Sequence, residues 1–217
     1  SGMSIATKAD TIGAMDIDSR IDAYPWPNIS KHLDAHGWAI IKRLLTASEC
    51  AAVAGLYTDD DHFRSHIVMA RHGFGKGEYR YFSYPLPPLV QGLRTALYPR
   101  LAPLANRWHE RMGMSVRFPA EHAEFIARCA ASGQNRPTPL LLQYDTGDYN
   151  CLHQDLYGEH VFPLQATVLL SAVLLSVLFL PWIIEELEKE EQRRDAKMRI
   201  GEVIVFIRDS IQPRWGD

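Results

Sequence analysis

A histidine and an aspartate separated by one residue, His153 and Asp155, are the side chains in this sequence whose spacing is best suited to chemistry. They end a short β-like run that follows the turn residues Asp145 to Asp148. On a strand, residues i and i+2 project from the same face, so that an imidazole and a carboxylate can converge on one metal ion. The spacing therefore predicts two neighbouring metal ligands.

A His and a carboxylate, joined by a second His from a distant part of a chain, form the ligand set of non-haem Fe(II) oxygenases. His160 is a candidate for that third ligand if a short turn folds it back, and a surface histidine is the alternative interpretation. Cys151 shares the strand face of His153 and Asp155, which allows a Cys-His-Asp nucleophile, a soft-metal site or a small apolar core residue.

Two further groups precede this region. His62, His66 and His72 follow three aspartates and include an i, i+4 pair, which predicts either a zinc or nickel site on a helix or a solvated acidic loop. Residues 73–77 carry three glycines and lack the features of a phosphate loop. They are therefore interpreted as a flexible lid.

We expect three residues in or near this lid to contact substrate, namely Lys76, Arg80 and Tyr81.

The elements that must position these residues change type along the chain. Helical patterns cover residues 28–35, 46–57, 88–98, 99–112 and 119–131. Gly37 breaks the first, a Thr46 and Glu49 capping box starts the second, and prolines open the last three. The acidic run of residues 59–61 and the glycine stretch of residues 73–77 bracket a loop-rich region. Short β runs cover residues 38–41, 140–144, 150–155, 162–171 and 202–207. Helices that largely precede strands predict an α+β fold in which helices buttress a sheet or barrel.

The predicted organisation is an N-terminal arm followed by one domain. Residues 1–27 form the arm, which opens on a Ser-Gly tag scar, and residues 28–217 form the domain. Within the domain, residues 28–135 are predicted to be a mainly helical buttress and residues 136–217 a β core.

Composition limits the function classes. The chain has 217 residues, of which 47% are hydrophobic and 23% charged, which is typical of a globular protein. Its net charge of -3 exerts no global attraction on nucleic acid, so a nucleic-acid partner would require a local basic patch. Three scattered cysteines and the lack of an apolar leader predict a cytoplasmic protein.

One apolar segment allows a different interpretation. Residues 161–184 are 24 consecutive residues without a charge, and residues 166–184 are long enough to span a bilayer. Two buried strands, or a strand and a buried helix, explain the same pattern, and no one-sided basic flank follows it. We therefore expect this segment to be buried in protein rather than in a membrane.

The hairpin around the His-x-Asp pair resembles a known family. Tyr144-x-x-Gly147-x-x-x-x-Leu-His153-Gln-Asp155 is similar to the iron-binding hairpin of the Fe(II)/2-oxoglutarate oxygenases, and its Leu-His-Gln-Asp is like that of the AlkB-type alkylation-repair dioxygenases. A longer resemblance, to a bacterial 2-oxoglutarate/Fe(II) oxygenase family associated with oxidative repair of damaged DNA, runs through RHGFGKGEYRYFSYPLP, RLAPLANRW, GQNRPTPLLLQY and NCLHQDLYGEHVFPLQATVLLS. It covers roughly residues 30–171.

The resemblance implies a double-stranded β-helix (a jelly-roll, cupin-like core), ferrous iron on His153 and Asp155, and 2-oxoglutarate contacted by Tyr144. It implies a dioxygenase that oxidises a C–H bond. The substrate classes are an alkylated nucleobase, a protein side chain or a small metabolite.

The sequence also departs from the family pattern. Such enzymes use a second His on a late strand and a later Arg or Lys, whereas no His follows His160 in this chain. Residues 201–207 are similar to the family's late strand, and the chain ends at residue 217, before the expected His. Residues 172–200 diverge from the sequence pattern of the family. The alternative hypothesis is therefore a catalytically inactive oxygenase-fold protein that acts as a binding module.

Overall fold

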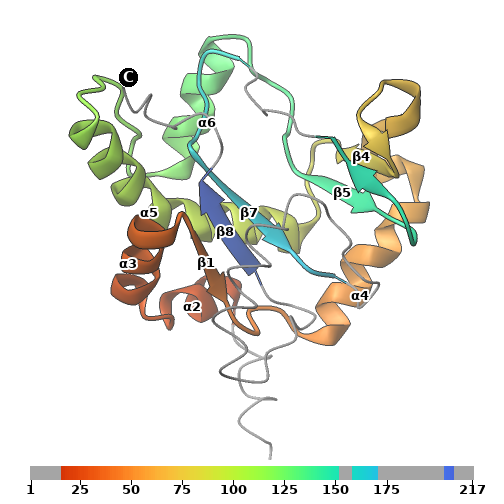
Figure 1. The fold of residues 1–217 in the computed structure, drawn as a ribbon, viewed down its shortest axis with the longest axis horizontal. Helices are drawn as coiled ribbons and strands as arrows, with labels where there is room; N and C mark the ends of the chain where they lie inside the picture. The colour runs from red at the N-terminus through yellow and green to blue at the C-terminus, as the bar shows by residue number, and fades with distance from the viewer. Residues whose placement is uncertain (1–15, 152–157, 171–202, 208–217) are drawn as a thin grey trace, which may run out of the picture.

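Helices and three small antiparallel sheets form the part of the chain that the structure describes. The structure is a computed structural model, and it describes residues 16–151, 158–170 and 203–207. Figure 1 shows strands from both ends of the sequence lying side by side near the centre, with helices on the outside. The predicted α+β class is thus confirmed.

The described elements are bounded as follows. The α-helices are α2 (Ile17–Asp22), α3 (Trp26–His36), α4 (Ala47–Gly55), α5 (Pro88–Arg111) and α6 (His122–Ala131). The strands are β1 (Trp38–Ile41), β2 (Phe63–Val68), β3 (Gly75–Lys76), β4 (Glu78–Phe82), β5 (Leu140–Gln143), β6 (Tyr149–Asn150), β7 (Leu164–Val168) and β8 (Val203–Ile207). Short 3-10 turns occupy Leu56–Thr58, Asp60–His62 and Met69–Arg71.

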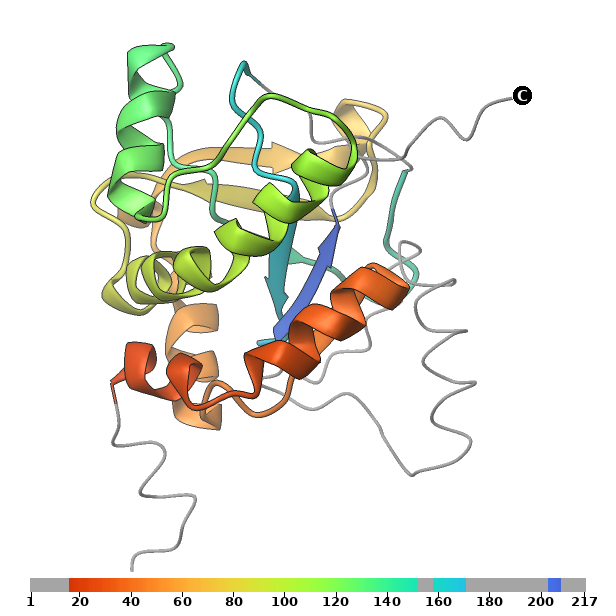
Figure 2. The ribbon, with the colours of Figure 1, turned by 90° about the vertical axis from the view of Figure 1, so that its left-hand side faces the viewer.

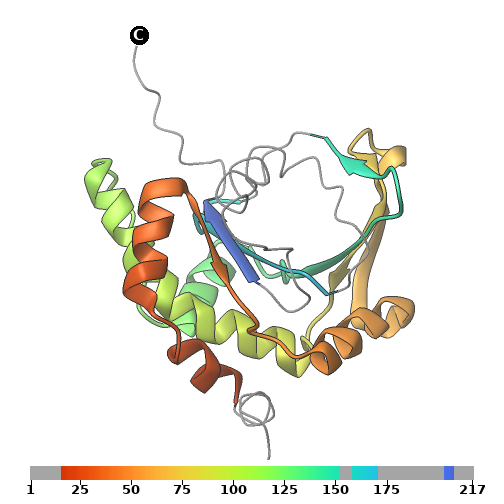
Figure 3. The same ribbon diagram turned by 60° about the horizontal axis from the view of Figure 1, so that its bottom comes forward.

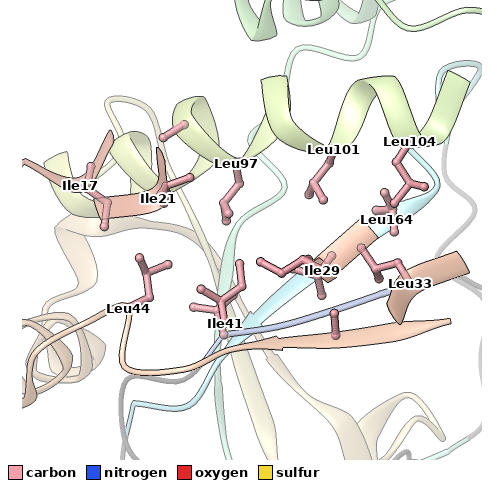
Figure 4. Close-up of a cluster of buried hydrophobic side chains, with 14 of the residues drawn as sticks. Ile17, Ile21, Ile29, Leu33, Ile41, Leu44, Leu97, Leu101, Leu104 and Leu164 are labelled. Carbon is pink, nitrogen blue, oxygen red and sulfur yellow. The ribbon is translucent and has the colours of Figure 1, made fainter. Parts of the chain in front are cut away.

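The first sheet has the order β1-β8-β7 and joins the two ends of the described chain. Its register pairs Ile41 with Val203 and Val168 with Val203, so that β8 lies between its two neighbours. Helices α2, α3 and α5 pack beside this sheet in Figure 2. In Figure 4, Leu97, Leu101 and Leu104 of α5 point toward the side chains of the sheet. The main hydrophobic core therefore lies between α5 and this sheet.

The second sheet has the order β2-β4-β5 and lies across from β7 and β8 in Figures 1 and 3. One of its faces is buried by Phe82 and Leu141, which pack with Val53 of α4 and with Leu86. The third sheet, β3-β6, is a two-stranded ribbon that joins Gly75 and Lys76 to Asn150 and Tyr149.

Several local predictions are confirmed. Gly37 ends α3 in the left-handed conformation, with φ 80°. Thr46 and Glu49 form the predicted capping box, in which the Glu49 amide donates to the Thr46 hydroxyl and the Thr46 amide donates to the Glu49 carboxylate. These signals depend only on neighbouring residues, which is why sequence alone could identify them.

Other predictions were wrong. Helix α5 is one helix of 24 residues with Pro99 and Pro103 inside it, although the prolines predicted a break at residue 99. A proline removes one intrahelical hydrogen bond, and burial of the α5 leucines against the first sheet offsets that loss. Helix α2 lies within the predicted irregular arm, and strands β2 and β4 occupy the predicted loop-rich region.

The apolar segment of residues 166–184 begins inside strand β7, and its remainder from residue 171 lies outside the described residues. Within the described ranges, no helix has the length and apolar character that a bilayer span needs.

Candidate functional site

Tyr144 directly follows strand β5 and packs onto the backbone of the neighbouring strand. A Cβ added to Gly77 would lie 2.6 Å from Cδ1 and 2.9 Å from Cε1 of the Tyr144 ring. Gly77 also has φ +118°, a backbone conformation that L side chains rarely adopt. Glycine at this position therefore gives the Tyr144 ring its place at the end of the second sheet.

The Tyr144 hydroxyl is held in its protonated form. Burial, and to a smaller extent the negative charge of Asp148, raises its pKa to about 12, against a partial lowering by a hydrogen bond with the Asn150 side chain. At neutral pH the phenol is thus a hydrogen-bond donor rather than a phenolate. Asn150 belongs to β6, which pairs with β3 rather than with β5, so Tyr144 connects the end of β5 to Gly77 and to the β3-β6 ribbon.

The turn between β5 and β6 is closed by Asp148. The Asp145 amide donates to Asp148 Oδ2 (2.9 Å), and the Asp148 amide donates to the Asp145 carbonyl (3.0 Å). Lys76 Nζ lies 3.3 Å from Asp148 Oδ1. The Asp145 amide, and then Lys76, holds the pKa of the buried Asp148 carboxyl below its usual range. Asp148 is therefore an ionised anchor for the Lys76 ammonium.

The glycine-rich stretch that was predicted to be a lid is one strand of the β3-β6 ribbon. Lys76 pairs with Tyr149, Gly75 pairs with Asn150, and the Cys151 amide donates to the Phe74 carbonyl at 2.8 Å. A Cβ at Gly75 would overlap the Tyr149 carbonyl oxygen, so this close approach requires glycine. Residues 149–151, which lead toward His153, are consequently hydrogen-bonded to residues 74–76.

The far side of the His-x-Asp segment is also anchored. The Gln134 side chain accepts from the His160 amide (2.8 Å) and donates to the His160 carbonyl (3.1 Å), so that it acts as a short strand partner. The Gln134 amide group also covers Gly158. The His160 ring lies 3.1 Å from the Ser132 hydroxyl, measured from Nε2 to Oγ, and this contact supports the surface interpretation of His160.

The predicted site residues fall into three groups. Tyr144 and Lys76 meet around Asp148, as described above. Arg80 and Tyr81 lie in β4, with Tyr81 4.3 Å below the Arg64 guanidinium. His153 and Asp155, the predicted metal ligands, lie outside the described residues.

Arg80 belongs to a different environment from Tyr144. Its guanidinium lies 4.9 Å from the centre of the Tyr57 ring and 5.7 Å from that of Phe63, and it forms an ion pair with Asp60. Arg80 pairs across the sheet with Leu141, which belongs to the core between this sheet and α4. In this structure Arg80 therefore packs between the second sheet and the residues that follow α4.

The proposed helical histidine site of His62 and His66 does not form. His62 ends a 3-10 turn and His66 lies in strand β2, where its Nε2 is 2.7 Å from Glu78 Oε2. Within the described ranges, no group of three or more His, Cys, Asp or Glu side chains could hold a metal ion.

Sequence reasoning missed four residues that build this region, namely Gly77, Asp148, Asn150 and Gln134. Isolated glycines within a β pattern signal a close backbone approach, and this signal could have identified Gly75 and Gly77. Nothing local marks Gln134, because its partner lies 26 residues further along the chain.

Comparison with known proteins supports the oxygenase class for this chain. Residues 77–210, more than half of the chain, match the Oxygenase-NA family, whose members are described as oxygenases catalysing oxidative methylation of damaged DNA. The chain belongs to this family. The match includes strands β4 to β8, and it extends beyond residue 171, where the resemblance noted in the sequence ends.

Two relatives are uncharacterized proteins of Mycobacterium tuberculosis, from strains CDC 1551 / Oshkosh and ATCC 25618 / H37Rv. Each is 47% identical over 90 residues, which is 42% of this chain and 39% of the relative. The chain thus matches less than half the length of these relatives. No solved structure matches it significantly.

Proposed function

We propose that this protein is an Fe(II)- and 2-oxoglutarate-dependent dioxygenase that oxidises a C–H bond of a damaged nucleobase. Family membership supports the oxygenase class, and the family description supports damaged DNA as the substrate class. The observation that carries the proposal is the Tyr144 hydroxyl, a protonated donor at the end of β5, next to the Asn150 side chain of β6, the strand that precedes His153 in the sequence.

In this proposal His153 and Asp155 hold the iron, which leaves positions for 2-oxoglutarate and O₂. When bound, iron and 2-oxoglutarate supply the activation of O₂ that C–H oxidation requires. A His imidazole and an Asp carboxylate are suitable donors for Fe(II), and residues at i and i+2 of an extended chain project from the same face. His153 and Asp155 are the two residues that the proposal assigns to the iron.

Tyr144 has a role that follows from its own chemistry. A neutral phenol donates a hydrogen bond to a carboxylate and adds no negative charge beside it. Its ring packs on Gly77 and its hydroxyl interacts with Asn150, so the donor is oriented before a ligand arrives. We assign Tyr144 to the binding of a 2-oxoglutarate carboxylate.

The two larger sheets support the finer fold that we propose, a double-stranded β-helix. Sheets β1-β8-β7 and β2-β4-β5 lie across from one another and are antiparallel, as the two walls of such a fold would be.

The test is an anaerobic titration of the full chain, first with Fe(II) and then with 2-oxoglutarate, in which calorimetry measures the binding. Aerobic incubation with an oligonucleotide that contains methylated bases should then release succinate. The matched variants His153→Ala and His160→Ala separate the proposed ligand from its surface neighbour. If the protein binds neither Fe(II) nor 2-oxoglutarate, or if both variants bind Fe(II) equally, the proposal is wrong.

A second candidate, a non-catalytic binding module of the same fold, is favoured by the two-residue ligand set in the sequence. Removal of a residue that hydrogen-bonds to a metal ligand typically reduces metal affinity about 10–100-fold, so loss of a ligand itself should reduce the affinity at least as much. This candidate predicts binding of damaged DNA without succinate release.

A further inference from the structure

The β3-β6 ribbon exposes two aromatic side chains beside the proposed site. Phe74 is 45% exposed and Tyr149 is 40% exposed. Large aromatic side chains are usually buried, and their exposure on a short ribbon is typical of a contact surface rather than of a core. Because Tyr149 directly opposes Lys76, an aromatic ring and a cation are neighbours across the ribbon.

Phe74 extends the same surface. Its carbonyl accepts from the Cys151 amide, so Phe74 lies at the other end of the ribbon from the turn. The His72 ring stacks on it, with centroids 5.4 Å apart and planes inclined by 23°. The stack holds the Phe74 ring in one orientation while almost half of the side chain stays open to solvent.

Positive charge accompanies the rings. The Lys76 side chain is 61% exposed, and the buried Asp148 carboxylate holds its ammonium 3.3 Å away at the surface of the ribbon. Arg71 and His72, which precede Phe74, are also exposed. The chain as a whole is acidic, so the exposed cations of Arg71 and Lys76 are the kind of local basic group that a polyanion requires.

Rings interleaved with cations suit single-stranded nucleic acid better than a protein partner. Each unstacked base offers a flat face to an aromatic side chain, and each phosphate offers an anion to a neighbouring cation. A duplex hides its bases in the stack, so an enzyme that acts on a base must first extract it or use a single strand.

We propose that the β3-β6 ribbon is a stacking platform for single-stranded nucleic acid, in which Phe74 and Tyr149 receive bases and Lys76 meets a phosphate. This inference rests on the proposed function, because it assigns the surface that holds the strand whose damaged base is oxidised. It adds a binding site that the metal and 2-oxoglutarate residues do not contain.

The test measures fluorescence anisotropy of a labelled 12-nucleotide single strand with the full chain, without iron or 2-oxoglutarate. We expect Phe74→Ala and Tyr149→Ala each to weaken binding by about 5- to 100-fold, as removal of a base-stacking ring does. Lys76→Gln should weaken binding and reduce the slope of log K against log salt by about 0.7, the value for one phosphate contact on a single strand.

The matched control is Tyr84→Ala, which removes a tyrosine of similar exposure, 48%, outside the ribbon. It should bind as the wild type does. Circular dichroism of each variant checks that the chain is folded, and Phe74→Leu and Tyr149→Leu, which keep apolar bulk and lose the flat ring, should also bind weakly.

Wild-type binding that is absent at about 100 μM protein, or that is unchanged in both alanine variants, overturns the platform. Tighter binding to duplex than to single strand also overturns it. If nucleic-acid binding depends on both rings but the protein binds no Fe(II), the stacking platform is retained and the proposed oxygenase is rejected. The failure of one proposal can therefore be distinguished from the failure of the other.

Discussion

The ring of Tyr144 occupies the space in which a side chain at Gly77 would lie. The two residues are 67 positions apart in the sequence. Gly77 directly precedes β4 and Tyr144 directly follows β5, and these two strands are paired. This contact connects the glycine-rich stretch to the residue that we assign to 2-oxoglutarate.

The first prediction is that Gly77→Ala destabilises the protein. The new Cβ would displace the Tyr144 ring, and alanine would be strained at φ +118°, so we expect a loss of about 2–4 kcal/mol in the free energy of unfolding. Urea denaturation measures it. The control is Gly55→Ala in α4, where nothing lies within 4 Å of the added Cβ and the change should be close to neutral. Equal effects of the two substitutions would contradict the proposed contact.

The second prediction concerns the Tyr144 hydroxyl. Tyr144→Phe keeps the ring on Gly77 and removes the donor, so it should weaken 2-oxoglutarate binding by about tenfold, the value of one hydrogen bond to a charged group. Iron affinity in the absence of 2-oxoglutarate should be unchanged. Calorimetry measures both, with Tyr84→Phe as an exposed control. A Tyr144→Phe protein that binds 2-oxoglutarate normally would remove Tyr144 from the site.

The third prediction concerns the ion pair that joins α2 to α4. Arg20, only 5% exposed, donates to both carboxylate oxygens of Glu49 at 2.5 and 2.9 Å. Glu49→Gln leaves the buried guanidinium, which also donates to the Leu44 carbonyl, without a charged partner, and we expect a loss of about 3 kcal/mol in stability. The exposed pair of Arg100 and Asp22 is the control, because Asp22→Asn should cost less than about 1 kcal/mol.

The ion pair of Glu49 also leads us to expect a loss of folding stability at acid pH. Hydrogen bonding from Arg20, followed by that from Thr46, lowers the Glu49 pKa to about 2. Its stabilising contribution is complete above its ordinary pKa of 4.5 and is lost as the pH falls toward 2, because the unfolded chain takes up the proton first. Denaturation midpoints between pH 2 and 4.5 measure this, and the Glu49→Gln protein should show a smaller slope.

The fourth prediction concerns a buried histidine at the start of α6. Burial, and then the charge of Arg94, lowers the His122 pKa from 6.5 to about 4, and its ring lies 5.2 Å from that of Tyr98. The unfolded chain therefore binds more protons than the folded protein between pH 4 and 6.5. Stability should rise with pH across this window by about 3 kcal/mol, and the rise should be complete above pH 6.5.

Thermal unfolding at pH 4.5, 5.5 and 7 measures this slope. His122→Gln should flatten it, whereas Glu49→Gln should alter only the more acidic window. An unchanged slope in the His122→Gln protein would mean that another group titrates there.

Local chemistry in the sequence was sufficient for several elements. The Thr46 and Glu49 capping box starts α4, and Gly37 ends α3, because each depends on hydrogen bonds or backbone freedom within a few residues. The short apolar runs within residues 38–41 and 140–144 similarly predicted β1 and β5. The role of Tyr144 in binding 2-oxoglutarate comes from the family resemblance and stays a prediction, to which the structure adds the burial of its ring and its contact with Asn150.

Tertiary structure decided what local pattern could not. Pro99 predicts a helix break, yet α5 continues because its leucines are buried against a sheet whose strands come from both ends of the chain. His62 and His66 have helical spacing, yet pairing with β4 makes residues 63–68 a strand and places His66 against Glu78. Sequence spacing thus determined which residues can do chemistry, and long-range burial and strand pairing decided which of them meet, because those energies depend on partners that lie far away in the chain.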